Sequence, residues 1–107
     1  MGGVLRELKR YGKPVYITEN GLATQDDEWR ERYIAEVLAE VHGAVQDGVD
    51  VRGYFHWTNL DNFEWARGYT CHFGLIAVDR KTMERTIKRS GRSYARIATQ
   101  NAVGVLD

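Results

Sequence analysis

One long amphipathic pattern, placed between two short apolar runs, constrains the fold of this chain more than any other feature. Apolar side chains recur every three to four positions from residue 29 through about residue 46, which predicts a helix. The runs VYIT at 15–18 and VRGYFHW at 51–57 are rich in β-branched and aromatic residues and predict strands. Two strands joined by such a helix pair in parallel through a right-handed crossover, so an α/β fold is expected. The apolar members of the helical pattern are Trp29, Tyr33, Ile34, Val37, Leu38, Val41 and Val45.

Shorter elements flank this unit. Residues 3–11 place apolar side chains on one helical face, so a helix is expected there. The stretch 58–72 is typical of a long loop, and 73–79 is expected to be an extended segment that turns near Asp79. A last helix is predicted near 91–100. Its side chains that face the core are expected to be Tyr94, Ile97 and Ala98.

Two parallel strands do not complete a sheet. Each strand leaves one edge unpaired, and parallel sheets are normally covered by helices on both faces. The 107 residues contain no repeat, low-complexity tract or linker, so 1–107 is expected to be one segment. We therefore expect this segment to belong to a larger fold and not to form a complete domain alone.

Composition argues against several classes of function. The 15 Lys and Arg residues balance the 15 Asp and Glu residues, which disfavours a nucleic acid or an anionic membrane as the partner. No apolar run approaches the roughly 18–20 residues of a membrane span, and the N-terminus lacks the pattern of a signal peptide. The single cysteine, Cys71, excludes an internal disulfide and fits a reducing compartment, so a cytoplasmic protein is expected.

The sequence predicts neither a metal nor a cofactor. Its three histidines and Cys71 do not follow the spacing of a zinc site, and no glycine pattern that binds phosphate occurs. The basic stretch 80–96 is expected to be a solvated helix face with salt bridges, and the alternative is a surface that binds an anionic ligand or a nucleic acid.

Glu19 is the first candidate for chemistry. It directly follows the first predicted strand and precedes Asn20 and Gly21. In β/α barrels, catalytic side chains lie at this carboxyl end of the strands. The alternative is an ordinary loop carboxylate that caps the next helix.

The second candidate is the run HWTNLDNFEW at 56–65, which follows the second predicted strand. It holds two indoles, an imidazole, two carboxylates and two amides. Sugars are bound by this mixture, because aromatic faces contact the apolar side of the ring while carboxylates and amides bind the hydroxyls. The alternative is that Trp57 and Trp65 fill a core and that Asp61 and Glu64 face solvent.

Three motifs together resemble glycoside hydrolase family 1, the retaining β-glucosidases and β-galactosidases. They are YITENG at 16–21, GYFHWTNLDNFEW at 53–65 and GYTCHFGLIAVD at 68–79. The resemblance runs from about residue 4 to residue 100. It implies a C-terminal fragment of a (β/α)8 TIM barrel with about two βα units plus a preceding helix. The chain would then contain the end of the sixth helix and the seventh and eighth strand–helix units.

The resemblance also implies roles for individual residues. Glu19 matches the catalytic nucleophile, and Trp57 matches the aromatic platform beneath the sugar. Glu64 matches the carboxylate that binds the 4- and 6-hydroxyls, while the indole N–H of Trp65 matches a ligand of the 3-hydroxyl. Phe73 matches an aromatic that lines the pocket near the 6-hydroxymethyl group.

The family's acid/base carboxyl lies in a Thr-(Phe/Leu)-Asn-Glu-Pro motif on an earlier strand, and this sequence lacks that motif. Glu64 matches a substrate-binding position and is not expected to replace it. The chain alone is therefore expected to be inactive, and to hydrolyse β-D-glucosides or β-D-galactosides only when the N-terminal part of the barrel completes it. The alternative is a non-catalytic fragment or self-assembling building block with a residual sugar-binding pocket.

Overall fold

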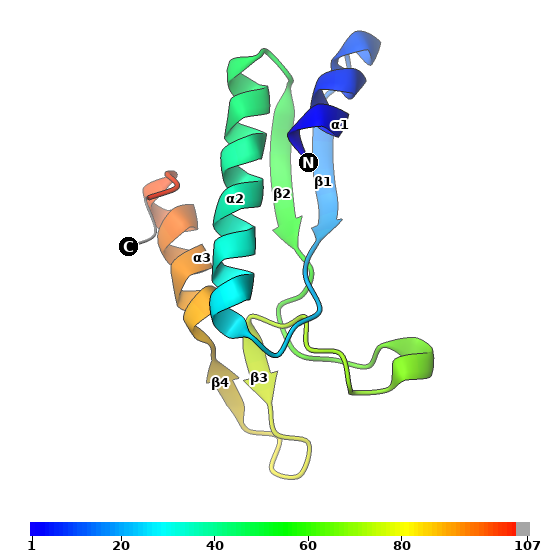
Figure 1. Cartoon of the computed structure of the whole chain (residues 1–107), viewed down its shortest axis with the longest axis vertical. Helices are drawn as coiled ribbons and strands as arrows, with labels where there is room; N and C mark the ends of the chain where they lie inside the picture. The colour runs from blue at the N-terminus through cyan, green and yellow to red at the C-terminus, as the bar shows by residue number, and fades with distance from the viewer. Residues whose placement is uncertain (105–107) are drawn as a thin grey trace.

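The computed structural model describes residues 1–104 and forms three helices, two short 3-10 turns and four strands (Figure 1). Strands β1 and β2 pair in parallel, and the long helix α2 connects them. The predicted strand–helix–strand unit is therefore confirmed. The elements in chain order are α1 (Gly2–Leu8), η1 (Lys9–Tyr11), β1 (Val15–Asn20), α2 (Asp27–Gln46), β2 (Val51–His56), η2 (Trp65–Arg67), β3 (Ile76–Val78), β4 (Arg85–Ile87) and α3 (Arg89–Gln100).

Helix α2 begins where the sequence supplies a cap. The carboxylate of Asp26 accepts a hydrogen bond from the backbone N–H of Trp29 at 3.0 Å, and two further acidic residues occupy the first turn. Negative charge at this end is favoured because the helix dipole is positive there. Acidic residues ahead of an apolar pattern thus set the start of this helix.

The core lies between the helices and one face of the β1–β2 sheet. Ile17 of β1 packs with Val37 and Val41 of α2 and with Leu5 of α1, and all four are buried. Burial of such a side chain stabilises the fold by roughly 1.5–3 kcal/mol. This cluster positions the carboxyl ends of the two strands relative to each other.

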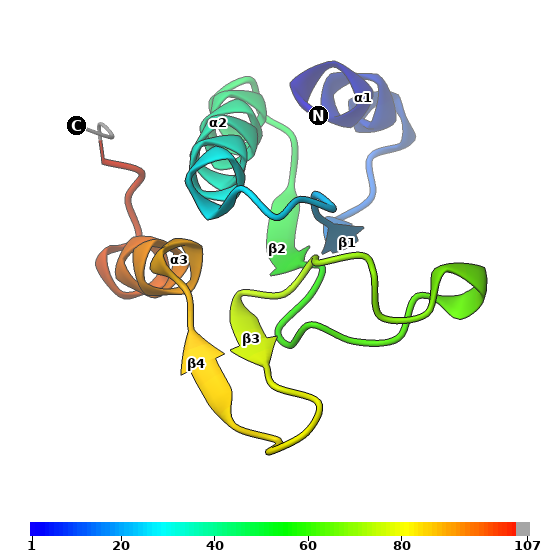
Figure 2. The same ribbon diagram turned by 60° about the horizontal axis from the view of Figure 1, so that its bottom comes forward.

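The opposite face of the same sheet is uncovered. Tyr16 of β1 is 54% exposed and Phe55 of β2 is 58% exposed. Figure 2 shows both α1 and α2 on one side of the two strands. Large aromatic side chains on an open sheet face form an apolar surface of the kind that usually contacts another layer or chain.

The predicted helix is confirmed, but two members of its apolar pattern are not buried. Trp29 is 51% exposed and Val45 is 41% exposed, whereas Arg30 and Glu31 are 1% and 5% exposed. The first turn of α2 is covered by loops and by α3, which offer polar partners instead of apolar ones. The spacing of apolar residues within the helix cannot show that polar partners from other elements bury Arg30 and Glu31.

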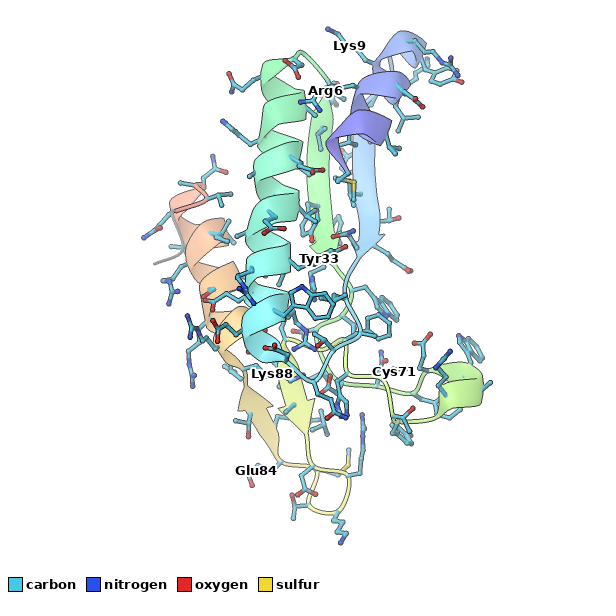
Figure 3. All side chains as sticks on the ribbon, in the orientation of Figure 1. Arg6, Lys9, Tyr33, Cys71, Glu84 and Lys88 are labelled. Atoms are coloured by element: carbon cyan, nitrogen blue, oxygen red, sulfur yellow. The ribbon has the colours of Figure 1, made fainter. Side chains whose placement is uncertain are left out.

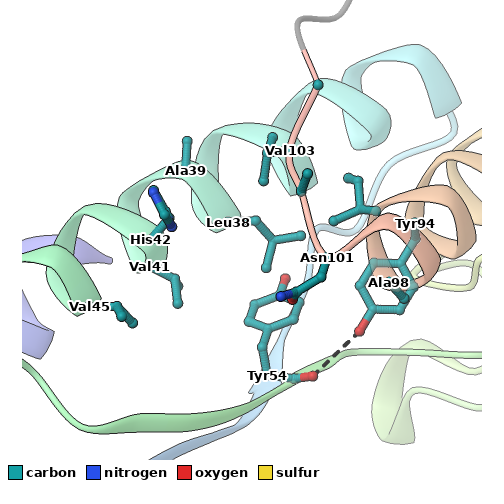
Figure 4. A pocket seen from close by; sticks show the side chains of 13 residues that line it. Leu38, Ala39, Val41, His42, Val45, Tyr54, Tyr94, Ala98, Asn101 and Val103 are labelled. Atoms are coloured by element: carbon teal, nitrogen blue, oxygen red, sulfur yellow. Dashed lines mark hydrogen bonds between the residues drawn. The ribbon is translucent and has the colours of Figure 1, made fainter.

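Helix α3 also buries a different face from the predicted one. Its buried residues are Ser90 and Ser93, which bind Asp27 and Glu31 of α2: the Ser90 hydroxyl donates to Asp27 at 2.6 Å, and the Ser93 hydroxyl donates to Glu31. Of the side chains expected in the core, Tyr94 does pack against Tyr54 of β2, with ring centroids 6.3 Å apart. Together with Ile97 and Ala98 it borders an open groove of about 770 Å³ between α2, α3 and β2 (Figure 4).

The predicted extended segment 73–79 and its turn after Asp79 form the first half of a hairpin, and the second strand of that hairpin was not predicted. Strand β3 pairs antiparallel with β4, and the backbone N–H of Lys88 then donates to the carbonyl of Leu75 at 2.9 Å. The expected basic face does form salt bridges with buried acids: Arg89 lies 2.5 Å from Glu31, and Lys88 lies 2.8 Å from Asp61.

Candidate functional site at the carboxyl ends of β1 and β2

Glu19 is the last residue but one of β1. The strand extends to Asn20, two residues further than the sequence predicted, because it continues to pair with β2. The side chain of Glu19 is exposed to solvent. It therefore lies at the end of the strand and not in the following loop.

A β-bulge determines which way Glu19 faces. Ile17 pairs with Tyr54 and Asn20 pairs with His56, so β1 has one residue more than β2 over this interval. Strict alternation from the buried Ile17 would turn Glu19 toward the helices. The extra residue gives that helix-facing place to Asn20, and leaves Glu19 exposed.

Trp57 lies directly beside this strand end. Its backbone N–H donates to the carbonyl of Asn20 at 2.8 Å, and its peptide bond to Thr58 is cis. At Gly21, a Cβ atom would lie 1.8 Å from the carbonyl oxygen of Trp57. Only glycine allows the two backbones to approach this closely, so Gly21 keeps Trp57 next to the end of β1.

Phe73 joins the same edge from a later segment. Its carbonyl oxygen accepts a hydrogen bond from the N–H of Thr58 at 3.3 Å and lies 3.3 Å from Nε2 of His56. The N–H of Leu75 in turn donates to the carbonyl of Thr58 at 3.0 Å. These bonds bring three of the five predicted site residues, Glu19, Trp57 and Phe73, to one edge of the fold.

The structure does not gather Glu64 and Trp65 with the other three. They lie on a loop that projects from the strand ends, with Trp65 in the η2 turn (Figures 1 and 2). The Trp65 side chain is 82% exposed. The loop is braced by an edge-on contact between Phe63 and Tyr69, whose ring centroids are 5.5 Å apart, and by Arg80 over the Tyr69 ring at 4.4 Å.

Asp61 neither faces solvent nor is free to bind a sugar hydroxyl, which were the two possibilities that the sequence suggested. It is 8% exposed, and its carboxylate pairs with Lys88 at 2.8 Å and accepts from the N–H of Gly74 at 2.7 Å. Burial raises the pKa of Asp61, but the bonds from Lys88 and Gly74 outweigh burial and hold that pKa below its usual value. Asp61 therefore anchors the base of the projecting loop.

Arg30 is a further residue of the site region that sequence reasoning missed. Its guanidinium donates to the carboxylate of Asp27 at 2.5 Å, to the carbonyl of His72 at 2.5 Å and to the carbonyl of Thr24. It thereby joins the loop after β1 to the segment that carries Phe73. The one signal in the sequence was its position four residues before Ile34, within the apolar stripe of the helix.

His56 is the third polar residue behind this edge. Its Nδ1 is buried and has no hydrogen-bond partner among the described residues. Burial lowers the pKa of the imidazole, and the nearby Arg30 charge lowers it further, against the hydrogen bond to Phe73. The ring also lies 6.2 Å from that of Tyr94. Burial behind the strand end thus disfavours the charged form of His56.

Within residues 1–104, no three His, Cys, Asp or Glu side chains come together in a way that could hold a metal ion. In the same range, no helix has the length and apolar character needed to cross a membrane.

Comparison with known proteins identifies relatives along almost the whole chain. The model for glycosyl hydrolase family 1 matches residues 4–103. A β-galactosidase from Sulfolobus acidocaldarius is 40% identical over 100 residues, which cover 94% of this chain and 20% of the relative. β-Glucosidase 4 from Oryza sativa subsp. japonica is 48% identical over 101 residues, covering 82% of this chain and 21% of the relative.

Solved structures agree with this match. A β-glycosidase from Pyrococcus horikoshii superposes with a TM-score of 0.93 at 48% identity, covering 96% of this chain and 24% of the other. The β-glucosidase from Thermotoga maritima in complex with glucoimidazole superposes with a TM-score of 0.93 at 38% identity. The match covers 96% of this chain and 26% of the other. These neighbours are α/β-barrel β-glycosidases, and the chain has the fold of one part of such a barrel. It spans about a fifth of the length of the curated relatives.

Proposed function

Because the chain belongs to glycosyl hydrolase family 1, we propose that it is the nucleophile-bearing portion of a retaining β-glycosidase. The substrate is a β-D-glucoside or β-D-galactoside, and activity requires the rest of the barrel. The observation that carries this proposal is the exposed carboxylate of Glu19 at the end of β1, beside Trp57.

Retaining enzymes use two carboxyl groups about 5–5.5 Å apart, and in this proposal Glu19 supplies one of them. Its carboxylate oxygen forms a bond to the anomeric carbon as the glycosidic C–O bond breaks. An acid from the remainder of the barrel protonates the leaving oxygen. Water then attacks the glycosyl ester, gives its proton to that same second carboxyl group, and releases Glu19.

The other four residues bind the sugar in this proposal. Trp57 is the platform beneath the ring, and Phe73 lines the pocket near the 6-hydroxymethyl group. Glu64 and Trp65 bind hydroxyls once the remaining strands surround the loop that carries them. Their present distance from the strand ends fits a loop whose neighbours belong to other parts of the barrel.

The barrel assignment follows the order of the elements. Helix α1 corresponds to the end of the sixth helix, β1 and α2 to the seventh unit, and β2 and α3 to the eighth, so 1–107 is one segment of a barrel. The open sheet face with Tyr16 and Phe55 supports a complementary N-terminal segment as the partner. A second copy of the chain could cover the same face, which makes self-association the competing outcome.

The experiment places this chain in a complete barrel. In a chimera, it replaces the segment that it matches in the Thermotoga maritima β-glucosidase, and hydrolysis of an aryl β-glucoside is measured. We expect turnover by the chimera and a fall of about 10²–10⁴-fold or more in Glu19→Gln. The matched control is Glu28→Gln, an exposed acid in the first turn of α2, which should retain activity. Turnover that survives Glu19→Gln would refute the assignment of the nucleophile.

A further inference from the structure

We propose that Asn20 is a positioning residue that aims the Glu19 carboxylate, and that it acts through the hydroxyls of Tyr33 and Tyr54. This inference rests on the proposed role of Glu19 as the nucleophile.

The amide of Asn20 is bound on both sides. Its Nδ2 donates to the hydroxyl oxygen of Tyr33 at 3.0 Å, and the hydroxyl of Tyr54 donates to its Oδ1 at 3.0 Å. Tyr33 belongs to α2, from which it reaches toward the end of β1 (Figure 3), and Tyr54 belongs to β2. The Asn20 carbonyl also accepts the N–H of Trp57. One residue therefore ties the end of β1 to the helix, to the neighbouring strand and to the Trp57 backbone.

These bonds close one side of the bulge. The two residues between Ile17 and Asn20 are exposed, and they are held at one end by the buried Ile17 and at the other by the amide of Asn20. If the amide lost its partners, the bonds to Tyr33 and Tyr54 would no longer hold Asn20 in the helix-facing place, and the strand could adopt regular alternation. Glu19 would then turn toward the helices, because a shift of one residue exchanges the two faces of a strand.

The tyrosines are suited to this role. Burial raises the pKa of Tyr54, and the neighbouring tyrosines raise it further, so its hydroxyl keeps the proton that it donates to Asn20. Its ring lies 6.3 Å from the ring of Tyr94, which limits its movement. Tyr94 donates weakly to the carbonyl of Tyr54, at 3.4 Å (Figure 4). The hydroxyls that bind the Asn20 amide are those of Tyr33 and Tyr54, and not that of Tyr94. It is therefore a matched control.

Aim matters because a nucleophile must approach the anomeric carbon along a narrow path. A displacement of about 1 Å costs on the order of 10²-fold in rate. Trp57 and Phe73 lie on other segments of the chain, and the side chain of Asn20 bonds to the two tyrosine hydroxyls instead, so substrate binding should change less than the direction of Glu19. The loss should therefore fall on kcat and leave KM little changed.

The test uses the chimera described above with the variants Asn20→Ala, Tyr33→Phe, Tyr54→Phe and Tyr94→Phe. The burst of dinitrophenolate from a 2-deoxy-2-fluoro-β-D-glucoside counts the active sites, and kcat is expressed per active site. We expect Asn20→Ala to lower kcat about 10–10²-fold and the two bonded tyrosine variants to lower it less, while Tyr94→Phe stays near the parent. The double variant Asn20→Ala/Tyr54→Phe should be no slower than Asn20→Ala, because the hydrogen bond that Tyr54→Phe removes is already lost in Asn20→Ala.

The outcomes separate the two proposals. A purely structural role would reduce the number of active sites without changing kcat per site, and that result would overturn the inference. An equal loss in Tyr94→Phe and Tyr54→Phe would also overturn it. If Asn20→Ala fails to fold, the tyrosine variants, which each remove one oxygen atom, decide the question. Turnover that is independent of Glu19 would overturn the proposed function and this inference with it.

Discussion

The guanidinium of Arg30 donates a hydrogen bond to the carbonyl oxygen of His72, 2.5 Å away and 42 residues later in the chain. The side chain is 1% exposed and pairs with Asp27 at 2.5 Å. It holds the two loops of the candidate site against the first turn of α2. The positions of Glu19 and Phe73 relative to each other therefore depend on a buried charge behind them.

Replacing this charge should destabilise the fold. In Arg30→Met, the Asp27 carboxylate and two carbonyl groups lose a partner, and the expected cost is about 3 kcal/mol or more. Because the chimera is about four times as long as this chain, this cost corresponds to roughly 3 °C in its unfolding midpoint. Arg32→Met, on the exposed side of the same helix, is the control and should change the midpoint little. Equal midpoints for the two variants in a calorimetric scan would show that the Arg30 bonds contribute nothing.

Gly21 tests how closely the two strand ends approach. In Gly21→Ala, the new Cβ meets the Trp57 carbonyl at 1.8 Å, so one backbone has to move. We expect a fall in activity of the chimera of about 10²-fold, since Glu19 and Trp57 move apart. Gly3→Ala, in a helix with nothing within 4 Å, is the matched control and should be neutral or stabilising by about 0.5–1 kcal/mol. A fully active Gly21→Ala chimera would contradict the tight approach.

The Asp61–Lys88 pair predicts sensitivity to acid. The pKa of Asp61 is lower in the folded chain than its usual value of 3.8, so the unfolded state binds the proton first as the pH falls. The stabilisation is complete above that value and is lost as the pH falls through the folded pKa. Thermal midpoints of Asp61→Asn should fall less steeply below about pH 4 than those of the parent, and Glu28→Gln should follow the parent. Parallel curves for Asp61→Asn and the parent would refute this contribution.

His56 makes the stability of the fold depend on pH in a higher range than Asp61 does. Its pKa is lowered from 6.5 by burial, so below that pH the unfolded state takes up a proton that the folded state does not. Stability should therefore decrease as the pH falls from about 7.5 toward 5.5. In His56→Gln this part of the slope should disappear, whereas His42→Gln, on the exposed face of α2, should keep it. An unchanged slope in His56→Gln would contradict the burial argument.

The sequence predicted the strand–helix–strand unit because its signals are local. The spacing of Ile34, Val37 and Val41 and the β-branched runs are set within each element. The end of β1 was not predictable in this way, because Glu19 and Asn20 are weak strand residues and extend the strand only by pairing with β2. Strand β4 was missed for the same reason, since its three residues contain one apolar side chain and gain their structure from β3.

The candidate site was predictable to a similar extent. Parallel pairing alone places Glu19 and Trp57 at one edge, because the carboxyl ends of parallel strands lie together. The burial of Arg30 and Asp61 depends on partners 42 and 27 residues away, and spacing within one element carries no record of them. The place of Trp65, in the η2 turn of a projecting loop, also has no signal in the spacing of its neighbours.

The most direct measurement of the central claim locates the covalent intermediate. The chimera is treated with a 2-deoxy-2-fluoro-β-D-glucoside that carries a dinitrophenolate leaving group, then digested, and the sugar ester is mapped by mass spectrometry. We predict one ester on the peptide that contains Glu19, and none in Glu19→Gln. An ester on any other carboxylate, or none in a chimera that hydrolyses the parent glucoside, would contradict the account.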